Sequence, residues 1–582
     1  MEKRDDIIDP DTAAWIVGVA AVLGLAAYAI AAWPLLVWSG GLPPLTDGVI
    51  TGARLPWHLG DPRDAYPVEL AGALPGPLGW WATITAPVAL LAAGAVAAAV
   101  RVDRWRGRRR LGVRSYDPRG WVTPRSFARP RDVKGLAYRF GQDSWSLLHV
   151  DRRQIGTGAE SHVLAIGPPR SGKSMALAAP WIMEAPGAVI TTSTKHELVA
   201  LCAAARARRG PCWVYAPLTS PAALRGVVPA RWTPLGGCSD WDSAQLVGHW
   251  LTDATPSSAS GGGEDSAAAR FWNAEASKIL GALLHTAALD PEQYSMTSVV
   301  EWIEGGVPTL TDAIDALGQV GGHPAAIRRL EGLIAQDTRT LSYTLMSAGQ
   351  LVDAYRFEAA QRSERTGPRV TIDDLLEANG TLFLLAPESR QDKVAPLFAA
   401  LLGEVFRALE ERTLLDGPLD PPARFVLDEA AHLAALSSLP ERLSLTSGQG
   451  ARIASLWQSH AQIRHRYRDQ ADTVIASSHA RIFLGPIADE ATRKLIVDLL
   501  DDEPAQRHSH HAGPFGAGRQ SKTIQETREP KASAQGLQQL ERWHGLAITG
   551  SELPMVGRVR PYWQRPHVQH ALNPPGDPPD AA

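Results

Sequence analysis

The stretch Gly167-Pro168-Pro169-Arg170-Ser171-Gly172-Lys173-Ser174 matches the phosphate-binding pattern G-x-x-x-x-G-K-[ST] at every position. The residues His162 to Ile166 before it are predicted to form a buried strand, and Met175 to Ala185 after it a helix. In this setting backbone N–H groups can surround phosphate oxygens, and the helix N-terminus adds positive potential. Lys173 is expected to reach the β- and γ-phosphates of ATP, and the Ser174 hydroxyl to ligate Mg²⁺. A chance match in a Gly-rich chain is the alternative, which the flanking strand and helix disfavour.

A second apolar strand, Arg424 to Glu429, ends in two adjacent carboxylates, which is the Walker B pattern. Asp428 is expected in the Mg²⁺ shell, usually through water, and Glu429 is expected to polarise the attacking water as general base. The alternative is an Asp-Glu pair that caps the next helix. Ile453 to Gln458 is a further strand, and the Gln458 amide at its end can sense the γ-phosphate or simply cap the strand.

Strands and helices alternate around these motifs, which predicts an α/β core with a parallel sheet and helices on both faces. The other predicted strands are Gly187–Thr192, Cys212–Pro217, Gly380–Ala386 and Ala480–Gly485. Lys195 and Glu197 follow the first of these, at an edge where open α/β sheets bind ligands. For these two residues, solvated charges at a helix start are an equal alternative. Two catalytic strand ends on a parallel sheet indicate a RecA-like P-loop ATPase.

The composition sets bounds on this interpretation. At 582 residues the chain exceeds one ordinary hydrophobic core. The net charge of −3 gives no overall basic footprint, so any nucleic-acid contact must be local. The 3 cysteines show no C-x-x-C spacing, which argues against a disulfide framework or a zinc site and favours buried thiols.

The N-terminal region contains two uncharged stretches, 13–38 and 80–100, each long enough to cross a bilayer. A signal peptide is the competing interpretation of the first stretch, and the acidic residues before it disfavour that. An arginine cluster follows the second stretch and places that side in the cytoplasm; its members are Arg101, Arg104, Arg106, Arg108, Arg109 and Arg110. We therefore expect a multi-pass membrane protein with the bulk of the chain cytoplasmic; the resemblance described below implies that this membrane is the cell inner (cytoplasmic) membrane.

The expected domain organisation follows from these patterns. A cytoplasmic N-terminus (1–12) precedes transmembrane helix 1 (13–38), an extracytoplasmic loop (39–79), transmembrane helix 2 (80–100) and a basic juxtamembrane linker (101–150). The ATPase core is expected at 151–243 and 362–565, interrupted by an all-α inserted subdomain at 244–361, and a Pro-rich tail closes the chain at 566–582. Within the second core segment, Arg507 to Ser533 is predicted to be a disordered loop and Gly545 to Gly550 an edge strand.

Taken in order, these motifs resemble the type IV secretion system coupling proteins, the TraG/TraD family of conjugative DNA-transfer ATPases. The resemblance covers most of residues 10 to 565. It rests on the two N-terminal spans, Gly167–Ser174, Thr192–Leu198, the all-helical insertion, Phe425–Leu433, Leu456–Gln462 and Ala480–Thr492.

The resemblance implies a hexameric inner-membrane ATPase, with ATP and Mg²⁺ as cofactors, that drives single-stranded DNA with its bound relaxase towards a secretion channel. It also implies that the all-α subdomain recognises cargo and DNA, and that a neighbouring subunit completes the ATP site with an arginine finger. That arginine usually lies just before the strand that carries the glutamine, where this chain has Thr446 to Gly450. Arg452 and Arg481 are the substitutes to consider.

Three alternatives remain open. An FtsK-like or HerA-like DNA pump belongs to the same motor class, although no C-terminal winged-helix module follows Leu500. The same motor could also pull a polypeptide. A docking platform that binds nucleotide with little turnover is favoured by the missing arginine. Intact Lys173, Asp428, Glu429 and Gln458 argue against that platform.

Overall fold

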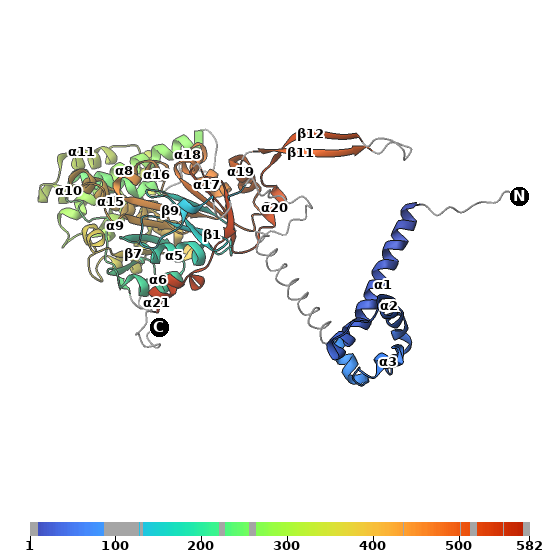
Figure 1. Ribbon diagram of the computed structural model, residues 1–582. Coiled ribbons are helices and arrows are strands. Elements are labelled where there is room, and N and C mark those ends of the chain that lie inside the picture. Colours follow the sequence, from blue (N-terminus) through green and yellow to red (C-terminus); the bar gives the residue numbers. More distant parts are fainter. Residues whose placement is uncertain are drawn as a thin grey trace. The chain divides into compact units, whose positions relative to one another are not determined.

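A computed structural model describes residues 10–85, 127–128, 132–219, 227–254, 264–434, 436–500, 502–511, 521–550 and 552–573, and no side chains for 10–22, 24, 264–267, 502–511 and 521–529. The chain divides into two compact units, Met1–Arg109 and Arg110–Ala582, which are described separately. Both appear as ribbons in Figure 1.

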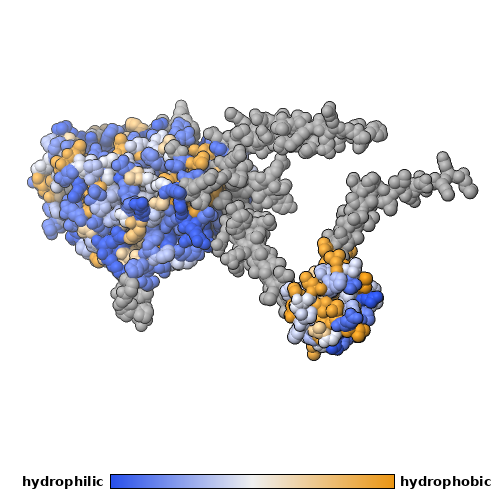
Figure 2. Space-filling model, in the orientation of Figure 1, coloured by the Kyte–Doolittle hydropathy of each residue, from blue (hydrophilic) through white to orange (hydrophobic). Residues whose placement is uncertain are grey.

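The N-terminal unit is helical. Its helices and 3-10 turns include α1 (Pro10–Ser39), α2 (Leu45–Arg54), η1 (Leu55–Trp57), η2 (Pro62–Ala65) and α3 (Val68–Ala71), and residues 77–85 are also helical. A small core forms around Trp80, whose indole N–H donates to the Tyr66 hydroxyl at 3.2 Å, and Tyr66 in turn donates to the Ala31 carbonyl at 2.9 Å. Many apolar side chains of this unit are nevertheless exposed, among them Trp57 and Val68. Figure 2 shows orange patches on the surface of this unit.

The two predicted membrane spans are not supported by the structure. Among the residues whose side chains it describes, no helix is both long enough and apolar enough to cross a bilayer. Part of each expected span lies outside this set, namely the side chains of 13–22 and 24 and all of 86–100.

The larger unit is built on a mixed sheet in the order β2-β1-β14-β13-β10-β3-β9-β8-β4-β7-β5-β6. The strands from β10 to β6 run parallel. They are β10 (Ala480–Leu484), β3 (Val163–Ile166), β9 (Ala451–Trp457), β8 (Ala423–Leu427), β4 (Val189–Ser193), β7 (Thr381–Leu385), β5 (Cys212–Tyr215) and β6 (Val228–Pro229). This confirms the predicted α/β core with its parallel sheet.

Helices cover both faces of the sheet, which explains why its strands read as continuous apolar runs. Along β3, Leu164 and Ile166 belong to one hydrophobic core, and Val163 and Ala165 to another. The core that contains Leu164 and Ile166 is covered by α15 (Gln391–Asp416) and α16 (Leu439–Leu445). The core that contains Val163 and Ala165 is covered by α5 (Ala179–Met183) and α6 (His196–Arg206) (Figure 1). All three cysteines are buried and free, as expected.

The sheet continues beyond β10 through four antiparallel strands, and here one prediction is wrong. These strands are β13 (His544–Thr549), β14 (Met555–Arg558), β1 (Ser146–Val150) and β2 (Arg153–Gly156). The strand predicted at Gly545 to Gly550 is β13, which lies between β10 and β14 and is therefore not an edge strand. One or two short strands are expected near Trp145 to Val150 from the sequence, and β1 confirms that expectation, but nothing in the sequence indicates that β14 joins β1 to β13.

The segment between β6 and β7 is helical, and Figure 1 shows its green and yellow helices gathered at one end of the larger unit. They are α7 (Trp241–Asp253), α8 (Glu264–Leu289), α9 (Met296–Gly305), α10 (Val307–Val320), α11 (Pro324–Ile334), α12 (Thr338–Leu351), α13 (Glu358–Ser363) and α14 (Ile372–Glu377). Their apolar faces pack into the same core as α15. The remaining helices are α17 (His460–Tyr467), α18 (Ala471–Ser477), α19 (Glu490–Leu500), α20 (Ala534–Gln538) and α21 (Pro566–Leu572).

The prediction of a disordered loop over Arg507 to Ser533 is wrong for the segments that the structure describes. β11 (Asp502–His511) and β12 (Ser521–Pro530) form a two-stranded antiparallel ribbon, paired from Asp502 with Pro530 to His511 with Ser521 (Figure 1). Backbone pairing does not require apolar side chains, and the β-branched residues of β12 favour an extended chain.

Candidate nucleotide-binding site

The candidate phosphate loop lies at the centre of the sheet's carboxyl edge. It follows β3 directly and leads into a π-helical turn, η4 (Ser174–Ala178), which continues as α5. The Gly167 N–H donates to the Trp457 carbonyl at 3.1 Å and so ties the start of the loop to β9. Single π-helical turns are frequent at functional sites. The local order of strand, loop and helix is therefore the one that the pattern requires.

The structure brings the two predicted metal ligands together. Asp428 follows β8 and is almost completely buried, and its backbone carbonyl accepts a hydrogen bond from the Thr192 hydroxyl of β4 at 2.8 Å. The Ser174 hydroxyl donates to Asp428 Oδ2 at 2.9 Å, although the two residues are 254 positions apart.

The chemistry of this pair fits Mg²⁺. Asp428 Oδ1 is buried and has no hydrogen-bond partner among the described residues. Burial and the neighbouring Glu429 raise the pKa of Asp428, and Lys195, Ser174 and Lys173 oppose that rise. A carboxylate oxygen without a partner, beside a hydroxyl, is a donor set that a hard cation with oxygen ligands accepts.

The predicted base and the predicted polar sensor form a hydrogen-bonded pair. The Gln458 side-chain N–H donates to Glu429 Oε2 at 3.0 Å, and the Gln458 backbone N–H donates to the Gln462 side-chain oxygen at 2.9 Å. Glu429 has a φ of 54°, which is unfavourable for a residue with a Cβ. Strained conformations of this kind persist where the surrounding structure enforces them, and they cluster at active sites.

Two lysines approach the same place. The Lys173 ammonium donates to the carbonyl oxygens of Gly167 and, at 3.1 Å, of Pro168, so the side chain folds back on its own loop. Burial lowers the pKa of Lys173, and the negative charges of Glu429 and Asp428 act against that shift. The Lys195 ammonium lies 3.4 Å from the Ser174 hydroxyl. Glu197, in contrast, is exposed in the first turn of α6.

The two arginines considered as fingers lie at the other end of their strands. Arg452 is near the start of β9, where it is buried and forms an ion pair with Asp143 at 2.8 Å. Arg481 is near the start of β10 and donates to the Ile475 carbonyl at 2.9 Å. The structure therefore brings neither arginine to the phosphate loop of its own chain.

An aromatic residue that the sequence analysis did not single out contacts the phosphate loop. A Cβ added to Gly172 would lie 2.4 Å from Cζ3 of Trp543, so the indole rests on this glycine. Trp543 immediately precedes β13, and β10 separates that strand from β3. No spacing rule connects residues 371 positions apart, so only the fold could reveal this contact.

Replacing Gly172 with alanine is expected to weaken MgATP binding about tenfold, because the left-handed conformation alone costs a residue with a Cβ about 1–2 kcal/mol. Gly172 has a φ of 100°, and its contact with Trp543 leaves no room for a methyl group. Isothermal titration calorimetry of the full chain measures the effect. Gly158→Ala is the matched control, because its Cβ would meet only the Ser161 hydroxyl, at 4.0 Å. Equal affinities of both variants would contradict the requirement for glycine.

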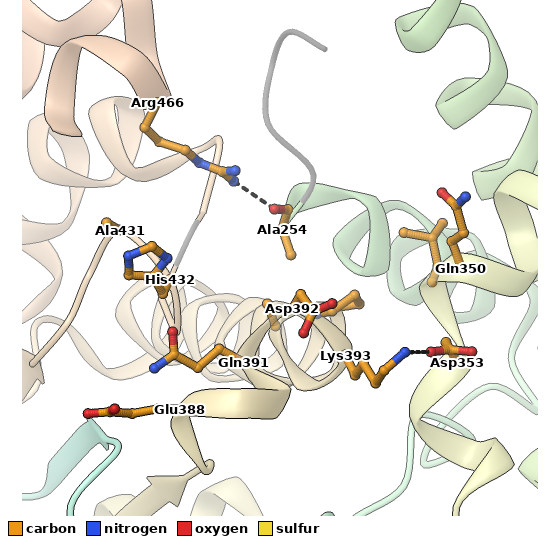
Figure 3. Close-up of a pocket in the computed structure, with 13 residues that line it drawn as sticks. Ala254, Gln350, Asp353, Glu388, Gln391, Asp392, Lys393, Ala431, His432 and Arg466 are labelled. Carbon is orange, nitrogen blue, oxygen red and sulfur yellow. Dashed lines mark hydrogen bonds and ion pairs between the residues drawn. The ribbon is translucent and has the colours of Figure 1, made fainter. Parts of the chain in front are cut away.

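A separate cavity of about 600 Å³ lies beside the site (Figure 3). It is lined by Glu388 and Gln391 after β7, by His432 after β8, and by residues of α12, α15 and α17. Its charged groups are largely paired, since Lys393 contacts Asp353 and Arg466 donates to the Ala254 carbonyl at 2.9 Å. No predicted site residue lines this cavity. Its lining residues come both from the α/β core and from the helical segment, so the cavity lies where these two parts meet.

Two family models match this chain. Residues 125–316 match the model described as type IV secretory system conjugative DNA transfer, and residues 422–542 match the model described as the TraM recognition site of TraD and TraG. No curated protein matches the sequence significantly.

Solved structures of the bacterial conjugative coupling protein TrwB share the fold. The unbound form has a TM-score of 0.55 at 15% identity, over 74% of this chain and 92% of that one. The complex with ADP and Mg²⁺ has a TM-score of 0.53 at 16% identity, over 75% of this chain and 93% of that one. The complex with the GTP analogue GDPNP has a TM-score of 0.54 at 16% identity, over 74% and 92%. The two family models match part of each half of the α/β core and include the residues that meet at its edge, and on this basis the chain belongs to the type IV coupling proteins, the TraG/TraD family of conjugative DNA transfer.

Proposed function

We propose that this protein is a P-loop ATPase that couples ATP hydrolysis to the recruitment and translocation of single-stranded DNA, with its bound relaxase, into a type IV secretion channel. The observation that carries the proposal is the 2.9 Å hydrogen bond between Ser174 and Asp428, which joins the two motifs and supports a metal site between them. The TrwB complexes with ADP and Mg²⁺ and with nucleotide analogues support nucleotide as the ligand.

In the proposed reaction, Lys173 exchanges its loop carbonyls for the β- and γ-phosphate oxygens of ATP. Ser174 and Asp428 would hold Mg²⁺, which would supply positive charge against the transferring phosphoryl group. Glu429 accepts a proton from the water that attacks the γ-phosphorus, and ADP leaves with the electrons of the broken P–O bond. Gln458 holds Glu429 in place before the reaction, through the 3.0 Å hydrogen bond.

Direct contacts offer a route from this site to the helical segment. Asp253, at the end of α7, accepts hydrogen bonds from the Ser438 N–H at 3.0 Å and the Ser438 hydroxyl at 2.6 Å, shortly after Glu429 in the chain. Arg466 on α17, which follows Gln458, donates to the carbonyls of Asp253 and Ala254. We propose that movements of the β8 and β9 ends on hydrolysis pass through these contacts to α7, and that the helical segment transmits them to the cargo.

The proposed assembly is a homohexamer at the inner membrane, in contact with the relaxosome and with channel components. The exposed apolar side chains of the N-terminal unit support an association with the membrane. An arginine from a neighbouring subunit would complete each ATP site. Of the two candidates, Arg481 is partly exposed and needs to break only one hydrogen bond to a carbonyl, whereas Arg452 would leave a buried ion pair.

The ATPase rate of the full-length chain is expected to rise with the concentration of single-stranded DNA and to rise less with duplex DNA. Lys173→Ala serves as the control for contaminating activity, because its loss removes the phosphate-binding ammonium. A chain that binds MgATP as a hexamer but turns it over neither with nor without DNA would contradict the motor and favour the docking platform.

A further inference from the structure

An aromatic cluster lies against the phosphate loop, and none of its members takes part in the chemistry proposed above. It consists of Trp543, Trp563, Tyr562 and Arg542. Trp543 rests on Gly172, its ring stands edge-on to that of Trp563 with centroids 5.7 Å apart, and the Arg542 guanidinium lies 4.8 Å from the Trp543 ring centroid. Tyr562 packs edge-on against Trp563 at 5.1 Å.

Trp543 adopts an energetically unfavourable backbone conformation within this cluster. Trp543 has a φ of 66°, in the left-handed region that bulky residues rarely adopt. Its carbonyl accepts a hydrogen bond from the Val559 N–H at 2.8 Å, just after β14, which fixes the conformation. Strained residues of this kind concentrate at ligand clamps and active sites. Trp543 and Tyr562 also pack against the hydrophobic core on this face of the sheet, so core packing accounts for part of their burial and leaves the rest of the cluster's surface open.

The cluster lies on the side of the loop to which the nucleoside must point. The groups that act on the terminal phosphate follow β8 and β9, on one side of β3: Asp428, Glu429 and Gln458. A bound nucleotide extends from this reacting end through its phosphates to the sugar and base at its other end. The base of the bound nucleotide therefore points in the opposite direction, towards β10 and β13, and Trp543 lies there, immediately before β13.

The exposed surface of the cluster has the chemistry that binds a nucleobase. Trp563 is 47% exposed, and Arg542 is exposed above the Trp543 ring. Indole and guanidinium planes both stack on the π-faces of bases, without selecting a particular base. We propose that the aromatic cluster is the base-stacking subsite of the nucleotide whose phosphates bind at Gly167–Ser174. This inference rests on the proposed function in requiring that the loop binds nucleotide.

The test compares a ligand that has a base with one that lacks it. Binding of MgADP and of magnesium tripolyphosphate to the full chain is measured by calorimetry, for Trp543→Ala and Trp563→Ala. Both variants are expected to weaken MgADP binding about tenfold, the usual effect of removing one stacked aromatic ring. Binding of tripolyphosphate is expected to stay unchanged, which separates loss of stacking from damage to the loop. Trp563→Phe keeps an aromatic face and should retain most of the MgADP affinity.

Leu553→Ala is the matched control, because Leu553 is 46% exposed and lies in the turn between β13 and β14, outside the cluster. Equal effects on the two ligands, or no effect on either, would overturn the subsite while leaving the ATP-binding loop intact. Failure of the unaltered chain to bind either ligand would instead overturn the proposed function, and the subsite with it.

Discussion

Replacing Glu429 with glutamine is expected to lower kcat for ATP hydrolysis by about 10²–10⁴-fold, the usual contribution of a positioned general base. The Glu429 carboxylate follows Asp428 directly and is held by the Gln458 amide at 3.0 Å. Glutamine preserves the size of the side chain but removes the proton acceptor. MgATP binding is expected to remain, because it depends on the loop amides, Lys173, Ser174 and Asp428.

Steady-state ATPase assays and calorimetry on the full chain separate these two effects. Glu197→Gln is the matched control, since this carboxylate lies at the same edge of the sheet but is exposed in the first turn of α6. Its turnover should equal that of the unaltered protein. If Glu429→Gln hydrolyses ATP at the unaltered rate, the base is another group and the reaction scheme above is wrong.

The α/β core could be predicted from the sequence because its strands are buried on both faces. Such strands read as short apolar runs, and every strand predicted between 162 and 485 is present. The grouping of Ser174, Asp428, Glu429 and Gln458 could also be predicted, because parallel strands deliver their carboxyl ends to one edge. The hydrogen bonds that join these residues are new information from the structure.

The remaining features depend on pairing between distant segments. β13 pairs with β10 on one side and with β14 on the other, and β14 pairs in turn with β1 from the start of the larger unit, so the edge-strand prediction failed. The β11–β12 ribbon has no apolar face that a period of two could reveal. Trp543 and Arg565 contact the phosphate loop and its helix from more than 370 positions away, and no local pattern marks either residue.

Replacing Arg565 with methionine is expected to lower the free energy of unfolding of the larger unit by about 3–5 kcal/mol, because it leaves a buried carboxylate without its charged partner. Arg565 and Glu184 are 1% and 0% exposed and lie 2.9 Å apart. Glu184 also contacts His567 at 2.7 Å and the Tyr138 hydroxyl at 3.0 Å.

Two further facts support a large effect. Burial would raise the pKa of Glu184, but Arg565, His567 and Ser146 outweigh it and hold the pKa at about 2, below the ordinary 4.5. The depressed pKa means that the charged form stabilises the fold above about pH 4.5, and that this stabilisation is lost as the pH falls towards 2. Arg565 also donates to the Ala176 carbonyl at 2.7 Å, so it supports the π-helical turn that follows Ser174.

Urea unfolding at neutral pH measures the loss, and two comparisons isolate its cause. Arg362→Met removes an ion pair with Glu358 whose side chains are 69% and 86% exposed, and it should change stability by less than about 0.5 kcal/mol. Adding Glu184→Gln to Arg565→Met should recover part of the loss, because it removes the unpaired charge rather than a second contact. If Arg565→Met is no more destabilising than Arg362→Met, the buried pair does not hold the C-terminal segment to the ATPase core. If the double variant is less stable than Arg565→Met alone, the hydrogen bonds of Glu184, and not its charge, dominate the contact.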